Sequence, residues 1–143
     1  MLQDHDSPAE LSFMHALQDY LLDQYDRQGL LIEANPTSNV YIARLQGYHE
    51  HPIFRWSPPD ESVLQAGGEH NRYGLRRGPM RVLVNTDDPG IMPTTLRTEY
   101  ALLREAAIDL GISRTVAETW LERLRELGVD QFLRNHQPVF TRR

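Results

Sequence analysis

The stretch VLVNTDDPG, residues 82–90, ends a short apolar run with two adjacent carboxylates, Asp87 and Asp88. The run begins at Met80 and lacks the alternation of apolar and polar residues that marks a half-exposed strand, so it predicts a strand buried on both faces, as in a parallel sheet. Two like charges at the end of such a strand repel each other unless a cation offsets them, and a divalent metal is the strongest such partner. The alternative is a turn in which a carboxylate accepts local backbone N–H groups before Pro89.

A second run, residues 30–34, is also short and mainly apolar, and it predicts another buried strand. It ends in NPTSN, residues 35–39, a dense cluster of turn formers that predicts a structured loop. Polar residues therefore follow the C-terminal ends of both strands. In parallel α/β folds the ligand chemistry lies at that edge of the sheet, so the two polar segments predict a site there.

Helical patterns flank the two strands. Residues 7–10 form a capping box with proline in the first helical position, and they predict an amphipathic helix of about 18 residues. Residues 95–110 have the periodicity of a second helix, and a third is expected from Ser113 or Thr115 to Gly128. The first helix is expected to bury one apolar face, made by Leu11, Met14, Leu17 or Gln18, Leu21, Leu22 and Tyr25.

The segment 41–79 has a weaker pattern, because prolines and glycines interrupt it, and it is predicted to be irregular. The order helix, strand, irregular connection, strand, helix, helix indicates an α/β fold.

Residues 72–81 are interpreted as a solvated insertion, although Arg with Gly and Tyr also suits contact with phosphate or RNA. In the last helix Trp120, Leu124 and Leu127 are interpreted as core residues, with an exposed partner-binding stripe as the alternative.

Composition bounds the class of protein. With 143 residues, of which 40% are hydrophobic, the chain has the length of one globular domain. A formal charge of -5 and a pI near 5.6 argue against a general nucleic-acid binder, which needs clustered Lys and Arg. The absence of cysteine excludes disulfides, thiolate metal sites and a cysteine nucleophile. No apolar run approaches the ~18 residues of a membrane helix, and the acidic N-terminus differs from a basic signal peptide, so we expect a cytoplasmic protein.

Four short motifs follow one another along the chain: EANPTSN at 33–39, HPI at 51–53, VNTDDP at 84–89 and TTLRTEYALL at 94–103. In this order they resemble the C-terminal part of the adenosine deaminase family of metal-dependent hydrolases, over residues 30–103. The resemblance implies that residues 1–143 are the C-terminal segment of a (β/α)8 TIM-like barrel, in which the two predicted strands are the seventh and eighth. Asn35, where family members often have Cys, and the long connection between His51 and Met80 indicate a divergent bacterial branch, such as the enlarged deaminase-like proteins of anti-phage defence.

The same resemblance implies a reaction. In that family a zinc ion held by histidines and one aspartate activates a water, which attacks C6 of the purine ring and displaces ammonia. Asp87 matches the aspartate that binds the metal, and Asp88 matches the neighbouring aspartate that hydrogen-bonds N7 of the purine. Residues 36–39 shape the loop and receive no chemical role. The implied substrate is an adenine nucleoside or nucleotide, and RNA adenosine stays open.

The other catalytic motifs of the family do not occur where they are expected. A His-x-His on the first strand, a His with a nearby Glu on the fifth and a His on the sixth all belong before the helix that starts at Ser7. One carboxylate cannot hold a catalytic zinc, which takes three or more protein ligands. We therefore expect no catalytic residue in this segment and the remainder of the barrel as its partner. Alone, the chain is expected to bind zinc weakly, to lack deaminase activity, and to fold poorly or self-associate.

Two further interpretations stay open. One is a noncatalytic assembly or binding module derived from the deaminase C-terminus, and the other is a small independent α/β protein with accidental motif matches. The segment His49-Glu50-His51 has the spacing of a His-x-His metal motif, yet it follows the loop of the first strand and adjoins Pro52. We interpret these as loop histidines, with His51 belonging to the HPI segment that starts a helix.

Overall fold

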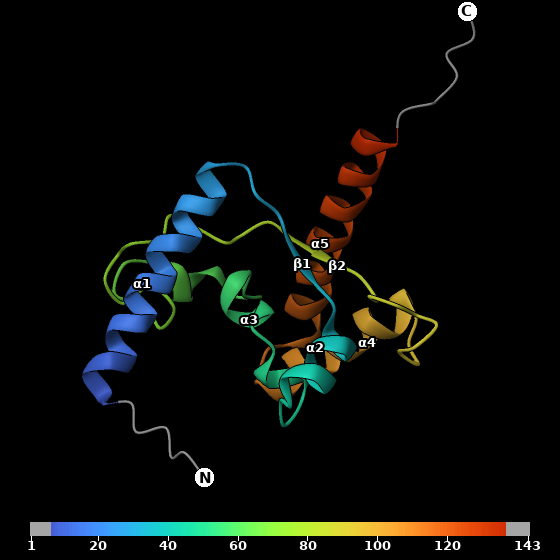
Figure 1. Cartoon of the computed structure of the whole chain (residues 1–143), viewed down its shortest axis with the longest axis horizontal. Coiled ribbons are helices and arrows are strands. Elements are labelled where there is room, and N and C mark those ends of the chain that lie inside the picture. Colours follow the sequence, from blue (N-terminus) through green and yellow to red (C-terminus); the bar gives the residue numbers. More distant parts are fainter. Residues whose placement is uncertain (1–6, 137–143) are drawn as a thin grey trace, which may run out of the picture.

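The computed structural model describes residues 7–136, and over this range the chain is a mixed α/β structure (Figure 1). One two-stranded parallel sheet is present within it, and these residues close no barrel. The α-helices are α1 (Pro8–Arg27), α2 (Pro36–Ala43), α3 (Ile53–Trp56), α4 (Leu96–Asp109) and α5 (Arg114–Asn135), the strands are β1 (Ile32–Ala34) and β2 (Val82–Val84), and two short 3-10 turns span Tyr48–Glu50 and Glu61–Leu64.

The sheet confirms the predicted parallel pairing. In the register Ile32 lies opposite Val82 and Ala34 lies opposite Val84, so the C-terminal ends of β1 and β2 are level. Ala34 and Val82 are fully buried. The pairing continues one residue further, because the Asn85 N–H donates to the Ala34 carbonyl at 2.9 Å. Residues that follow the two strands therefore start from adjacent points at one edge.

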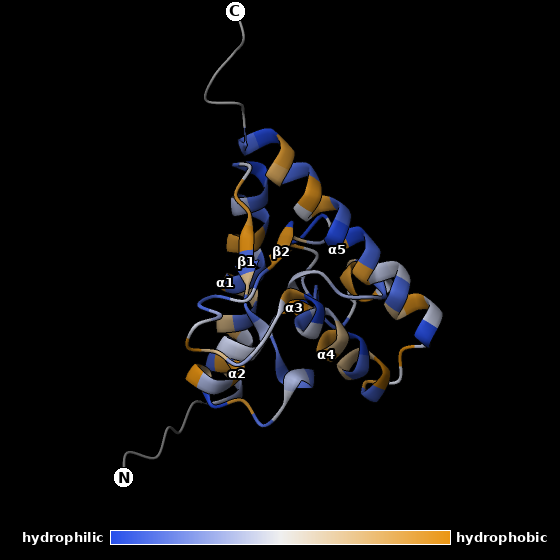
Figure 2. Cartoon of the chain, turned by 90° about the vertical axis from the view of Figure 1, so that its right-hand side faces the viewer, coloured by the Kyte–Doolittle hydropathy of each residue, from blue (hydrophilic) through white to orange (hydrophobic). Residues whose placement is uncertain are grey.

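Helices α4 and α5 pack against each other and against β2, and they enclose the core (Figure 2). Leu103 of α4 and Leu124 of α5 are buried there. Trp120 of α5 is 1% exposed, stacks at 5.3 Å between ring centroids on Phe54, and donates from Nε1 to the Ser57 carbonyl at 2.7 Å. The prediction of core residues on the last helix is therefore confirmed for Trp120 and Leu124, while Leu127 is only half-buried.

Two predicted boundaries are wrong. Residues 35–39 do not form a loop, because α2 starts at Pro36 and runs to Ala43. Proline at this first position has a φ already suited to a helix, and its missing N–H is one that the first turn leaves unpaired anyway. The last helix does not end at Gly128 but continues to Asn135. A single glycine inside a helix costs only about 1 kcal/mol relative to alanine, which the neighbouring turns outweigh.

The segment 41–79 is more ordered than predicted. It contains α3 and both 3-10 turns. The buried side chain of Arg76 holds parts of this segment together by hydrogen bonds to backbone carbonyls. The interpretation of residues 72–81 as a solvated insertion is correct for exposed positions such as Arg72 and Arg77 and wrong for Arg76, whose side chain is buried. A guanidinium reaches inwards here because backbone carbonyls accept its N–H groups.

Helix α1 begins as predicted, with a reciprocal capping box between Ser7 and Glu10. Its predicted buried apolar face is wrong. Leu11, Met14 and Leu17 are 43%, 41% and 43% exposed, and of the apolar residues predicted for this face only Leu22 is buried. Figure 1 shows α1 to the left of the two strands and α4 to their right, while α5 overlaps the strands in this view.

An acidic side chain attaches α1 instead. Asp19 is 3% exposed and its Oδ1 accepts from Arg55 Nη2 at 2.8 Å, and the same Nη2 donates to the His15 carbonyl at 3.1 Å. A polar anchor replaces apolar packing on this face of the helix. Within the described residues, none of the helices is both long enough and apolar enough to cross a membrane.

Candidate functional site

Asp87 lies three residues beyond the end of β2, with its backbone in the left-handed region at φ 60°. Its backbone N–H donates to Asn35 Oδ1 at 3.1 Å, and its carboxylate Oδ2 accepts from Ser38 Oγ at 2.7 Å. The side chain is otherwise exposed. The segments that follow the two strands therefore meet at the edge where the sequence predicts a site.

Asp88 has a different environment. Its Oδ1 accepts from the Gly90 backbone N–H at 2.9 Å, which closes a local turn of the kind that Asp side chains often make. The residue is exposed and makes no such contact with the segment 35–39.

His51 stands behind this edge as a buried, fully hydrogen-bonded group. Its ring is 1% exposed, Nε2 lies 2.9 Å from Asn39 Oδ1, and Nδ1 accepts from the Ile53 N–H at 3.0 Å. Burial lowers the pKa of the ring from 6.5 to about 4, so the imidazole is neutral at neutral pH. Both ring nitrogens are engaged by the protein, which favours the interpretation as a structural histidine over a metal ligand. His49 is exposed.

The described residues do not fit a zinc ion by themselves. Within residues 7–136 no three His, Asp or Glu side chains gather closely enough to hold a metal ion. Asp87 offers one carboxylate, and its Oδ2 already accepts from Ser38. A structural or catalytic zinc takes three or four protein ligands, so at most one of them is present at this edge.

Glu99 is a residue of this region that sequence reasoning missed. Its side chain is fully buried on α4, Oε2 accepts from the Thr37 backbone N–H at 2.9 Å, and Oε1 accepts from the Thr94 hydroxyl. The carboxylate thus caps the first turn of α2, where backbone N–H groups lack partners and negative charge is favoured. Its place in the TTLRTEYALL motif was the available signal, but a first-turn acid is also common on exposed helices.

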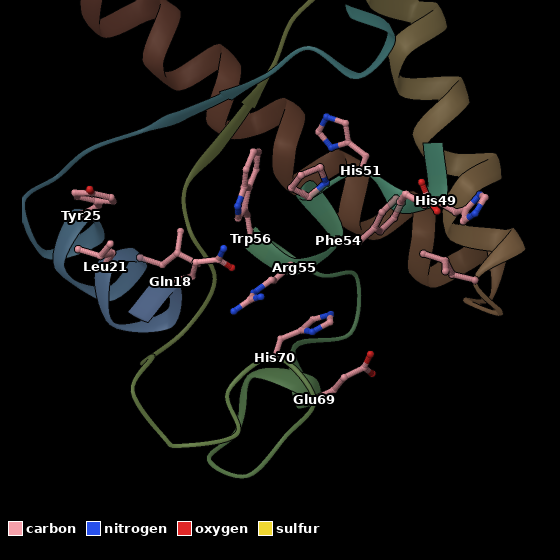
Figure 3. A pocket seen from close by; sticks show the side chains of 14 residues that line it. Gln18, Leu21, Tyr25, His49, His51, Phe54, Arg55, Trp56, Glu69 and His70 are labelled. Atoms are coloured by element: carbon pink, nitrogen blue, oxygen red, sulfur yellow. The ribbon is translucent and has the colours of Figure 1, made fainter. Parts of the chain in front are cut away.

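A cavity of about 700 Å³ lies between α1 and the segment 49–56 (Figure 3). Leu21 and Tyr25 line one side, and Phe54, Trp56 and His70 line the other. Burial lowers the pKa of His70. Neither Asp87 nor Asp88 lines this cavity, so it is separate from the edge described above.

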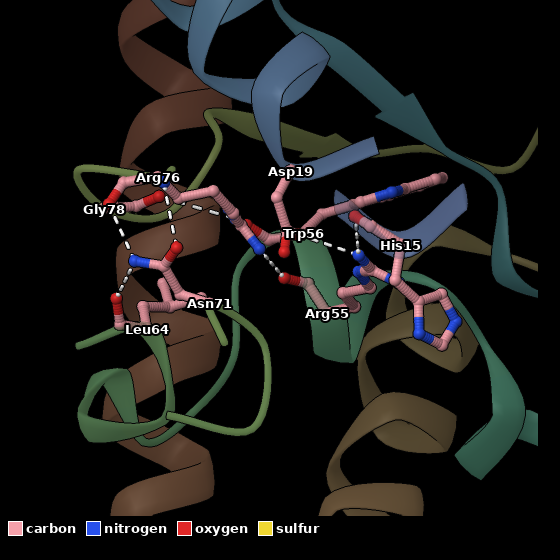
Figure 4. A network of polar contacts seen from close by, with 8 residues as sticks. All are labelled: His15, Asp19, Arg55, Trp56, Leu64, Asn71, Arg76 and Gly78. Carbon is pink, nitrogen blue, oxygen red and sulfur yellow. Dashed lines mark hydrogen bonds and ion pairs between the residues drawn. The ribbon is translucent and has the colours of Figure 1, made fainter. Parts of the chain in front are cut away.

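A network of polar contacts links different parts of the segment 53–79 to one another (Figure 4). Arg76 donates from Nη1 to the Arg55 carbonyl at 2.8 Å and from Nη2 to the Trp56 carbonyl at 2.9 Å. Asn71 brackets the same turn, donating to the Leu64 and Arg76 carbonyls at 2.8 Å each. Burial lowers the pKa of Arg76, and Asp19 partly offsets that effect. These bonds hold α3 and its flanking turns in place, so this basic segment has a structural role.

No family model matches the chain, and no solved structure matches it. The likeness to adenosine deaminases therefore rests on the four sequence motifs.

Proposed function

We propose that residues 1–143 are the C-terminal part of an adenosine deaminase-like zinc hydrolase, with β1 and β2 as the seventh and eighth strands of its barrel. The hydrolase converts an adenine nucleoside or nucleotide to the inosine-type product. The parallel pairing of the two strands supports this assignment, since every strand of such a barrel is parallel to its neighbours. The position of the polar residues at the C-terminal edge supports it as well.

The contact between Ser38 and Asp87 is the observation that carries the proposal. These residues belong to two motifs that lie 49 positions apart in the sequence, and their side chains are 2.7 Å apart in the structure. The parallel register of β1 and β2 brings the two segments to one edge, and this hydrogen bond adds a direct link between side chains of the two motifs. A hydroxyl donor orients a carboxylate and leaves its other oxygen for a ligand, which is what the proposed site requires.

Two residues have roles in the proposed site. Asp87 supplies one carboxylate ligand to a zinc whose histidine ligands, together with the catalytic Glu, come from the remainder of the barrel. Asp88 is the hydrogen-bonding partner of N7 of the purine; because N7 has no hydrogen, the proton of this bond has to come from the Asp88 carboxyl group. No residue of this segment acts as the general acid or base.

The test is complementation. Residues 1–143 are coexpressed with a barrel portion that carries the missing histidine motifs, and bound zinc and inosine formation are measured on the purified complex. We expect Asp87→Ala to lower the zinc content by roughly tenfold or more, because the site loses a direct ligand. Asp109→Ala, which removes an exposed carboxylate at the end of α4, is the matched control and is expected to leave zinc unchanged. Equal zinc in both variants would overturn the assignment of Asp87.

A noncatalytic assembly module is the second candidate, and the exposed apolar face of α1 favours it. In that case Asp87→Ala leaves partner binding intact, whereas polar substitutions at Met14 and Leu17 abolish it. A cooperative two-state melt of residues 1–143 alone would instead favour an independent small α/β protein.

A further inference from the structure

The conformation of Asp87 needs support from its surroundings. A φ of 60° is uncommon for a residue with a side chain and costs free energy, so it persists only where neighbouring contacts fix it. The contacts come from one segment. Asn35 Oδ1 accepts the Asp87 N–H at 3.1 Å, and the Ser38 hydroxyl donates to the carboxylate at 2.7 Å.

Asn35 is held in turn by Asn39. The Asn39 side-chain Oδ1 accepts from the Asn35 backbone N–H at 3.0 Å and lies 2.9 Å from His51 Nε2. A backbone N–H can only donate, so the oxygen of the Asn39 amide, and not its nitrogen, faces both partners. The hydrogen-bonded chain therefore runs from His51 through Asn39 and Asn35 to the backbone of Asp87.

His51 has a defined tautomer at the start of this chain. The Ile53 N–H donates to Nδ1 at 3.0 Å, so Nδ1 is unprotonated and Nε2 carries the hydrogen that Asn39 accepts. Burial keeps the pKa of the ring at about 4, which keeps this neutral tautomer over the ordinary pH range. Its two nitrogens thus have two separate partners, one local and one that leads to Asp87.

We propose that His51 is a positioning residue for Asp87: its Nε2–H fixes Asn39, Asn39 fixes the Asn35 backbone, and the Asn35 side chain holds Asp87 in its left-handed conformation. The chain of contacts presets the direction of the carboxylate before any ligand arrives. What Asp87 then binds rests on the proposed function; the positioning itself does not.

A purely local role for His51 makes the opposite prediction. The ring also lies edge-on to Trp56, at 6.0 Å between centroids, and accepts the Ile53 N–H at the start of α3. If these contacts are its whole role, then only Nδ1 and the bulk of the ring matter. If His51 positions Asp87, then Nε2 matters.

Two substitutions separate the two nitrogens. In His51→Gln the side-chain amide reaches the place of Nε2 and can still donate to Asn39. In His51→Asn the amide oxygen takes the place of Nδ1 and can still accept from Ile53, but the side chain is too short to reach Asn39. Hydrogen exchange of the Asp87 amide is measured in both variants of the full chain, with amides of α5 as the internal reference for global folding.

We expect exchange of the Asp87 amide to become roughly fivefold faster in His51→Asn, as for the loss of one ordinary hydrogen bond, and to stay within about twofold of the parent in His51→Gln. The reverse order, or equal exchange in the two variants, overturns the proposal. Where either variant also loses protection in α5, the pair Asn39→Asp and Asn39→Leu decides. In Asn39→Asp a carboxylate oxygen still accepts from Asn35 and His51, so we expect the Asp87 amide to stay protected from exchange. In Asn39→Leu no acceptor is left, so we expect faster exchange. Equal exchange in this pair also overturns the proposal.

This readout is independent of zinc and of catalysis. If the complementation experiment fails while His51→Asn still exposes the Asp87 amide, the deaminase assignment falls and the positioning role stands. If complementation succeeds but the exchange rates of the two variants are equal, the deaminase assignment stands and the positioning role of His51 falls.

Discussion

Asp87 and Asp88 adjoin each other and carry the same charge, yet their side chains have different partners. Asp87 turns to Ser38 on α2, and Asp88 turns back to the N–H of Gly90. The separation lowers their mutual repulsion without a cation between them. The local turn is therefore observed at Asp88, whereas the Asp87 carboxylate is held by a side chain from the segment that follows the other strand.

His51 makes the stability of the chain depend on pH. Its pKa is lowered from 6.5 to about 4 by burial, so between these values the unfolded chain binds more protons than the folded one. Stability is full above the unfolded pKa and falls as the pH drops toward 4, by up to ~3 kcal/mol. His70, whose pKa burial also lowers, acts in the same direction.

Urea unfolding at about pH 7 and about pH 5 measures this loss in the parent chain, in His51→Gln and in His49→Gln. We expect His51→Gln to remove most of the pH dependence, because the glutamine amide does not titrate. The exposed His49 serves as the matched control, and its variant should keep the dependence of the parent. A His51→Gln curve parallel to the parent would contradict the assignment.

At the scale of elements, α4 and α2 are joined through a buried charge. Glu99 accepts the Thr37 N–H in the first turn of α2, so a residue on one helix completes the N-terminus of another. The same turn carries Ser38, one residue further along. The position of the Asp87 partner therefore depends on α4.

We expect Glu99→Ala to lower the free energy of unfolding by roughly 2–4 kcal/mol, because it leaves a buried N–H unpaired and opens a cavity. Glu99→Gln keeps one acceptor oxygen and is expected to cost about half as much. Denaturant unfolding checks both, and Glu105→Ala on the exposed face of α4 is the control, with an expected change under about 0.5 kcal/mol. Equal losses for Glu99→Ala and Glu105→Ala would rule out this role.

At the scale of the whole molecule, two surfaces lack cover. The sheet has only two short strands within residues 7–136, so the outer edge of each has no strand beside it there. The apolar face of α1 is exposed as well. Both features are expected where strands and helices of a larger barrel pack, and both favour association of the chain alone.

We expect residues 1–143 alone to sediment as species heavier than the 16.6 kDa monomer. The double substitution Met14→Gln with Leu17→Gln is expected to shift the distribution toward the monomer, because it removes exposed apolar surface from α1. Sedimentation velocity at matched concentration measures this. Ile91→Gln with Val116→Gln, two exposed apolar positions outside α1, is the control, and an equal shift in both variants would exclude a specific role for α1.

The features that local sequence determines were predictable. The capping box at Ser7, the helix predicted over residues 95–110 and the parallel pair of buried strands all follow from short patterns, and the structure has them, with the helix at Leu96–Asp109. The contacts of buried polar groups were not predictable, because Arg76 and Glu99 look like ordinary surface charges until the fold places carbonyls and N–H groups around them. The prediction that the apolar face of α1 is buried failed for a related reason. Periodicity predicts that a helix has an apolar face, but it does not say whether residues 1–143 supply the surface that covers it.

Trp120 and Trp56 are the two tryptophans of the sequence, and they lie in different surroundings. Trp120 of α5 is buried and donates to the Ser57 carbonyl, whereas Trp56 is half-buried and lines the cavity beside α1. Indole emission is sensitive to such differences in polarity. If one tryptophan at a time is replaced by phenylalanine, the fluorescence of the other can be followed without an attached dye. The emission of Trp120 then reports on the interior, and that of Trp56 reports on whether α1 stays in place beside the cavity.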